Sequence, residues 1–90
     1  MINVTDDEIK TNVAANLQRL LRLHNMTGLK LSQLCGESQP TISNLLRGQY
    51  VPKVGTLSRV AAALGTSIDY LVSPPVEPVI RKSQEFVETA

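Results

Sequence analysis

Aromatic residues and cysteine are scarce in this 90-residue chain, which holds no tryptophan, one phenylalanine, two tyrosines and one cysteine. A single cysteine cannot form a disulfide within the chain, and Cys35 lies at helical spacing from Leu31, which favours a buried structural thiol. The core must therefore be built mainly from aliphatic side chains. A chain of this length provides one small domain, with little room for an enclosed active site.

Long apolar runs are also absent, and we expect no signal peptide. No apolar stretch approaches the roughly 20 residues that a membrane-spanning helix needs. The beginning MINVTDDE is acidic, whereas a signal peptide begins with positive charge and continues with an apolar stretch. We therefore expect a cytoplasmic protein.

The sequence has little that could carry catalysis or bind a metal. His24 is the single histidine, and together with one cysteine it supplies neither a nucleophile with its base nor a cluster of metal ligands. There is no glycine-rich phosphate loop and no internal repeat. We expect no enzymatic activity, no metal and no cofactor.

The net charge of +1 conceals an uneven distribution. Between Lys10 and Val72, seven basic residues stand against two acidic ones, Glu37 and Asp69, which leaves this segment at +5. Acidic residues gather near both ends of the chain instead. A basic centre between acidic ends is typical of a protein that binds nucleic acid. The seven basic residues are Lys10, Arg19, Arg22, Lys30, Arg47, Lys53 and Arg59.

Five segments carry apolar residues at intervals of three and four, the spacing of one helix face. The first begins with a capping box, in which Thr5 and Glu8 are available to backbone amides, and runs to about His24. No segment alternates in the manner of a strand, so the sequence predicts an all-α fold. The other helices are expected between Thr27 and Gly36, from Ser38 to Arg47, ahead of Gly65, and from Ser67 to Val72.

The inward-facing residues of these helices follow from the same periodicity. Helices turn by about 100° per residue, so positions three and four apart share a face. The predicted core residues are Ile9, Val13, Leu17, Leu20 and Leu21 in the first helix, Leu31, Leu34 and Cys35 in the second, Ile42, Leu45 and Leu46 in the third, Leu57, Val60, Ala61 and Leu64 in the fourth, and Ile68, Leu71 and Val72 in the fifth.

The helix that begins after Ser38 carries Gln39, Ser43 and Asn44 on its polar side and no acidic residue. Amide and hydroxyl groups both donate and accept hydrogen bonds, as base edges do, whereas phosphates repel a carboxylate. Only two residues separate Gly36 from this helix, which indicates two helices joined by a tight turn.

The run MTGLKLSQLCGESQPTISNLLRG, then VP, then TLSRVAAALGTSIDYLV, resembles the lambda-repressor and Cro-like (XRE-type) helix-turn-helix family over about residues 11–72. The resemblance is most specific at these positions: Gly36, Ser38, Thr41-Ile42-Ser43, Arg47-Gly48, Pro52, Ala63-Leu64-Gly65 and Ile68-Asp69-Tyr70-Leu71. It implies a compact five-helix DNA-binding domain at residues 1–72. It further implies a transcriptional regulator, a repressor of phage or bacterial type, that binds a palindromic operator as a homodimer. In this family the second helix of the motif, here residues 38–47, lies in the major groove.

The resemblance also implies the residues that contact DNA. Gln39 is the best candidate for reading a base, because its amide can bond N6 and N7 of adenine, and Asn44 has the same chemistry. Pro40 offers apolar contact, and the loop after the helix approaches phosphates. The full set is Thr27, Gly28, Ser38, Gln39, Pro40, Thr41, Ser43, Asn44, Arg47, Gln49, Tyr50 and Lys53.

The chain departs from the family pattern at three places. Gly28 stands where relatives carry a glutamine that touches the DNA backbone. Lys53 stands at the usual cap of the fourth helix, so we expect that helix to start irregularly. Leu21 and Leu46 stand where many relatives carry an arginine and a glutamate that form a partly buried ion pair. Replacing both partners with apolar residues is often neutral or stabilising.

Residues 73–90 form a proline-containing tail that Pro74 and Pro75 separate from the fifth helix. We expect the tail to be a dimerisation segment or a linker. The expected dimer contact comprises Ile68, Leu71, Val72, Val79, Phe86 and Val87. A second interpretation stays open, in which the protein is an antitoxin or other protein-binding module whose tail binds a partner such as a toxin.

Overall fold

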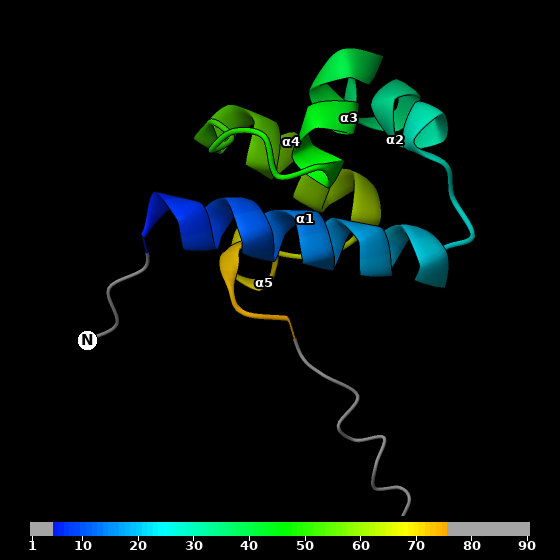
Figure 1. The fold of residues 1–90 in the computed structure, drawn as a ribbon. Coiled ribbons are helices and arrows are strands. Elements are labelled where there is room, and N and C mark those ends of the chain that lie inside the picture. The colour runs from blue at the N-terminus through cyan, green and yellow to red at the C-terminus, as the bar shows by residue number, and fades with distance from the viewer. Residues whose placement is uncertain (1–4, 76–90) are drawn as a thin grey trace, which may run out of the picture.

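The computed structural model describes residues 5–75, and over these residues the chain forms helices without strands. Figure 1 shows the longest helix, α1, crossing the middle of the molecule, with α2, α3 and α4 on one side and α5 on the other. The predicted all-α, five-helix architecture is confirmed over this part of the chain. The helices are α1 (Asp6–Leu23), α2 (Gly28–Cys35), α3 (Gln39–Leu46), α4 (Val54–Leu64) and α5 (Ile68–Val72).

Capping bonds set the helix boundaries. Thr5 Oγ1 accepts a hydrogen bond from the Glu8 amide at 3.2 Å, and Glu8 Oε1 accepts one from the Thr5 amide at 2.9 Å. These two bonds are the predicted capping box, which satisfies amides that have no partner within the helix. The side chains of Thr27, Ser38 and Ser67 cap α2, α3 and α5 in the same way.

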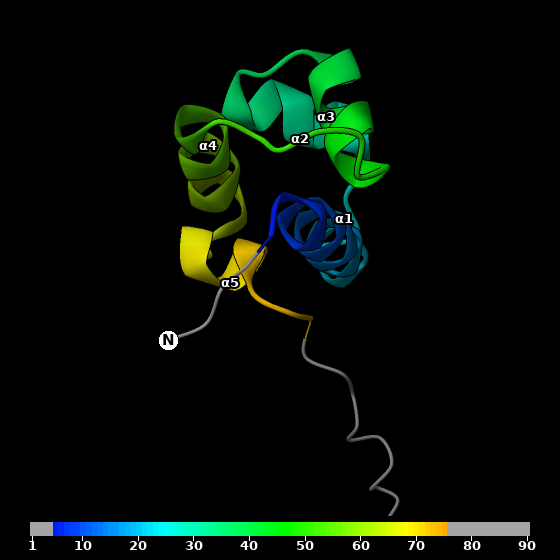
Figure 2. The same cartoon turned by 60° about the vertical axis from the view of Figure 1, so that its left-hand side comes forward.

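The five helices pack around one core. α1 packs against α3, α3 against α2, α2 against α4, α4 against α5, and α5 against α1 again, so the packing closes into a ring. Figure 2 looks nearly along α1 and shows the other helices arranged around it. Each helix contributes an apolar side chain that is at most 1% exposed, and burying one such side chain stabilises the fold by roughly 1.5–3 kcal/mol. These are Val13, Leu17, Leu31, Ile42, Leu45, Val60 and Leu71.

Two asparagines on α1 hold the end of α5. Asn16 is 1% exposed, and its Nδ2 donates to the carbonyl oxygens of Tyr70, Leu71 and Ser73 at 2.9, 3.0 and 2.8 Å. Asn12 Nδ2 donates to one more carbonyl oxygen of α5 at 2.9 Å. The last carbonyls of a helix have no partner within it. Side chains of α1 therefore supply the partners that the five-residue α5 cannot provide for itself.

The inward position predicted for Leu34 is wrong, because its exposure is 51%. The buried face of α2 consists of Leu31, Ser32 and Cys35, and Leu34 lies about 110° away from the centre of that face at 100° per residue. Ser32 is buried at little cost, since its hydroxyl donates to the Leu29 carbonyl at 2.7 Å. The prediction that Cys35 is buried is confirmed.

The dimer contact expected at Leu71 requires a correction too. Leu71 is 0% exposed and belongs to the core, so its side chain cannot touch a second copy of this fold. Ile68 and Val72, its neighbours on α5, are half-buried and pack at the core's edge. The remaining expected contacts, Val79, Phe86 and Val87, lie outside the described residues.

Candidate nucleic-acid interface

The turn between α2 and α3 consists of Gly36, Glu37 and Ser38. Gly36 has φ 75°, a left-handed conformation that glycine adopts without steric cost. Ser38 Oγ accepts from the Thr41 amide at 3.2 Å and also bonds the Thr41 hydroxyl at 2.9 Å. The hydroxyl of Ser38 therefore caps α3. The predicted pair of helices joined by a tight turn is present.

α3 divides into an inner and an outer face. Ile42 and Leu45 are each 1% exposed and lie in the core. Gln39 and Pro40, in the first turn, are exposed. Leu46 was predicted to face inward and is half-buried, packed against the core's edge. The remaining predicted contact residues of α3, all half-buried, are Thr41, Ser43 and Asn44.

Asn44 and Arg47 are bonded to each other near the end of α3. Arg47 Nη2 donates to Asn44 Oδ1 at 2.8 Å. This bond orients both side chains before any ligand is present. It uses one of the two lone pairs of Asn44 Oδ1, so Asn44 keeps its Nδ2 donor and one acceptor position for a ligand.

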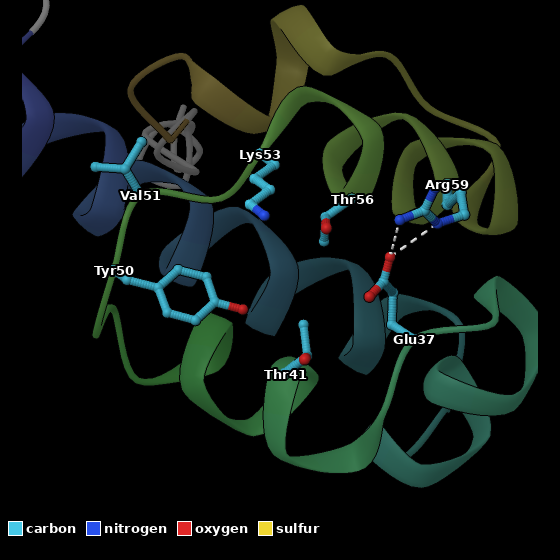
Figure 3. Close-up of a pocket in the computed structure, with 7 residues that line it drawn as sticks. All are labelled: Glu37, Thr41, Tyr50, Val51, Lys53, Thr56 and Arg59. Atoms are coloured by element: carbon cyan, nitrogen blue, oxygen red, sulfur yellow. Dashed lines mark hydrogen bonds and ion pairs between the residues drawn. The ribbon is translucent and has the colours of Figure 1, made fainter.

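The loop from Gln49 to Lys53 borders a hollow of about 460 Å³ between the turn, α3 and the start of α4. Figure 3 shows the Tyr50 hydroxyl and the side chains of Lys53, Thr41 and Thr56 around one space. Tyr50 is half-buried and packs against the core, whereas Gln49 and Lys53 are exposed. The full lining is Glu37, Thr41, Tyr50, Val51, Lys53, Thr56 and Arg59.

The first turn of α4 lacks a side-chain cap, as the lysine at position 53 predicts. Lys53 makes no capping hydrogen bond, yet its backbone has φ −75° and ψ 155°, the extended conformation of an ordinary N-cap. Its carbonyl accepts from the Leu57 amide at 3.0 Å. The irregular start that the sequence led us to expect is therefore not observed.

The other departures from the family pattern fit the packing. A Cβ added to Gly28 would lie 3.5 Å from Leu46 Cδ1 and 3.6 Å from Ile42 Cγ2, which is ordinary van der Waals contact. A Cβ is therefore sterically acceptable at position 28. Leu21 is 8% exposed in the core, and Leu46 packs against that core, so two apolar residues replace the ion pair without leaving a buried charge.

Two bonds that tether α3 were not predicted. Gln18 Nε2, on α1, donates to the carbonyl oxygen of Leu46, the last residue of α3, at 2.8 Å. Arg59, on α4, forms an ion pair with Glu37 in the turn that precedes α3. Partners so far apart in the sequence leave no local signal, because helix packing alone brings them together.

Neither a metal site nor a membrane span emerges from residues 5–75. No group of three or more histidine, cysteine or acidic residues lies close enough there to hold a metal ion. No helix in this part of the chain has the length and apolar character needed to cross a bilayer.

Comparison with known proteins agrees with this geometry. A family model described as helix-turn-helix, HTH_3, matches residues 17–71. The uncharacterized HTH-type transcriptional regulator y4dJ of Sinorhizobium fredii (strain NBRC 101917 / NGR234) is 37% identical over 70 residues, which cover 78% of this chain and 91% of that protein.

Solved structures share the fold. The hypothetical transcription factor NHTF from Neisseria matches with a TM-score of 0.72 at 20% identity, over 93% of this chain and 94% of that one. An HTH_3 family transcriptional regulator from Vibrio cholerae matches with a TM-score of 0.70 at 27% identity, over 74% of this chain and 38% of that one. The chain belongs to the HTH_3 family of lambda-repressor-like helix-turn-helix proteins, which are DNA-binding transcriptional regulators and not enzymes.

Proposed function

We propose that this protein is a sequence-specific repressor that acts in the cytoplasm and binds a palindromic operator as a homodimer, with α3 in the major groove. The observation that carries the proposal is the first turn of α3. Gln39 and Pro40 project from a helix whose opposite face is fixed in the core by Ile42 and Leu45. A rigid helix with exposed hydrogen-bonding groups at its beginning suits base recognition.

Base contacts are proposed for three positions on α3. The Gln39 amide offers a donor and an acceptor, which match N7 and N6 of adenine. Pro40 offers apolar contact to a thymine methyl group. Asn44 presents its Nδ2 donor, which suits N7 of a purine or O4 of thymine, and Oδ1 keeps one lone pair beside its bond to Arg47.

Backbone contacts are proposed for the residues around α3. Gln49 and Lys53 are exposed in the loop that also carries Tyr50. Thr27 caps α2, and Gly28 is its first residue. Helix N-termini and basic side chains attract phosphates, and such contacts fix the register of a protein on the duplex. Ser38, Thr41 and Ser43 lie at the border of this proposed footprint.

The dimer is proposed to use α5 and the tail. Ile68 and Val72 are the α5 members of the expected contact that are not fully buried. A two-fold dimer would place its two copies of α3 about 34 Å apart, one helical turn of DNA. Occupying a promoter in this way excludes other proteins, so repression needs no further activity. The alternative antitoxin role depends on the tail, of which residues 76–90 lie outside the described part of the chain.

A selection of binding sites from random duplex DNA tests the proposal. We expect an inverted repeat with half-sites one helical turn apart, bound by two copies of the chain. Affinity should fall steeply with salt, with a log–log slope of about 0.9 per phosphate neutralised. Failure to enrich any sequence would contradict specific recognition, and one copy bound per enriched site would contradict the dimer.

A further inference from the structure

An ion pair joins α4 to the turn that precedes α3. Arg59 Nε donates to Glu37 Oε2 at 2.8 Å, and Arg59 Nη2 donates to the same oxygen (Figure 3). The Glu37 side chain is 13% exposed, whereas that of Arg59 is 56% exposed. Within residues 5–75, these are the side-chain hydrogen bonds that connect α4 with the turn or with α3. The carboxylate is therefore largely withdrawn from water, and Arg59 supplies the positive charge beside it.

Gly55 lies beside the Arg59 guanidinium. A Cβ at position 55 would lie 3.4 Å from Arg59 Nη1 and 3.8 Å from Nη2. The guanidinium group therefore lies over the preceding turn of α4. These distances are ordinary van der Waals contacts, so a Cβ at position 55 could be accommodated beside the guanidinium.

The ion pair lies where it can control the start of α3. Glu37 directly precedes the N-cap Ser38 and stands two positions before Gln39. At the other end of α3, Gln18 on α1 donates to the Leu46 carbonyl at 2.8 Å. The helix is thus tethered at its two ends to two different neighbours.

We propose that Glu37 and Arg59 are positioning residues for base recognition: their ion pair sets the orientation of the first turn of α3 and hence the discrimination between base pairs. This inference rests on the proposed function, in which α3 reads bases. Base contacts need accurate placement, and a displacement of about 1 Å is enough to weaken them strongly. Phosphate contacts by flexible lysine and arginine side chains tolerate such a displacement. The ion pair should therefore affect specific binding far more than non-specific binding.

The test compares two conservative variants, Glu37→Gln and Arg59→Lys. The first keeps the shape of the side chain but removes its charge, and the second keeps the charge but loses the contact through two guanidinium nitrogens. For each variant, fluorescence anisotropy gives Kd for the selected operator and for a scrambled duplex of equal length. The discrimination ratio is Kd for the scrambled duplex divided by Kd for the operator. We expect this ratio to fall about tenfold in each variant. The scrambled duplex should be bound as before by Arg59→Lys and slightly tighter by Glu37→Gln.

A double variant and a charge-matched control complete the experiment. If the two residues act through one ion pair, Glu37→Gln combined with Arg59→Lys should lower the ratio no further than either single change. Asp7→Asn also removes one negative charge, at an exposed side chain of α1 whose carboxylate lies 3.7 Å from Lys10 Nζ. This control should leave the ratio unchanged.

Two results would overturn the inference. Discrimination equal to that of the parent in both single variants, whatever happens to their thermal stability, would show that the pair only stabilises the fold. Additive losses in the double variant would show that the two residues act separately. A parent protein that binds operator and scrambled duplex equally would instead refute the proposed function itself, so the two failures are distinguishable.

Discussion

Two asparagine amides on α1 and the side-chain amides on α3 have opposite environments. On α1, Asn12 and Asn16 are buried, and their nitrogens donate to backbone carbonyls at the end of α5. On α3, Gln39 is exposed and Asn44 is half-buried beside Arg47. A buried amide must find its partners within the protein, whereas an exposed amide keeps hydrogen-bonding capacity for a ligand. Position relative to the apolar face, and not residue type, determines whether an amide stabilises the fold or is available for recognition.

Among the substitutions that test this comparison, we expect Asn16→Ala to have the largest effect on stability. The substitution leaves three carbonyls at the end of α5 without their amide donor, and unsatisfied buried groups are costly. We expect a loss of roughly 3 kcal/mol in the free energy of unfolding. Urea denaturation followed by circular dichroism measures it. Asn44→Ala is the matched control, with an expected change within about 0.5 kcal/mol; equal losses at the two positions would refute the contrast.

Gln39→Ala should show the opposite behaviour. We expect a cost of about 2 kcal/mol in binding to the selected operator, confined to particular base pairs, with stability unchanged. The measurement is a titration against operator variants that carry single base-pair changes. Retention of the parent's base preferences would remove Gln39 from the proposed readout.

A buried charge, like a buried amide, needs a partner within the protein, and this can be tested where α1 packs against α3. Leu46→Glu places an unpaired carboxylate at a half-buried site, and we expect a loss of about 1.5 kcal/mol in stability. Adding Leu21→Arg should recover part of that loss, because the charges are then paired. Thermal melts of both single variants and the double variant give the coupling. Additive effects would mean that the two positions do not interact.

The smallest expected effect is at Gly28. A Cβ there meets only ordinary contacts, so Gly28→Ala should raise stability by about 0.5 kcal/mol, chiefly by restricting the unfolded chain. Gly28→Gln should in addition tighten binding to operator and scrambled duplex alike, because a phosphate contact carries no sequence information. Differential scanning calorimetry and the two titrations check these points. A destabilised Gly28→Ala would indicate strain that the packing does not show.

Local chemistry explains why much of the fold was predictable. Thr5, Thr27 and Ser38 cap their own helices, and Gly36 adopts the left-handed conformation that ends α2. Each of these features depends on residues within four positions, so the sequence alone specifies them. The outer face of α3, with Gln39 and Pro40, follows from the same periodicity.

Long-range packing explains what was not predictable. Glu37 meets Arg59 only because α4 packs beside the turn. Asn16 did carry a local signal. It lies three residues after Val13 and four before Leu20, on the apolar face of α1, where a polar residue requires internal partners.

Nuclear magnetic resonance of the side-chain amides tests the central claim most directly. Adding the selected operator to ¹⁵N-labelled protein should shift the side-chain amide signals of Gln39 and Asn44, while those of Asn12 and Asn16 remain unchanged. The account predicts this division because only the α3 amides face the proposed DNA. Unperturbed Gln39 and Asn44 signals at saturating operator would contradict it.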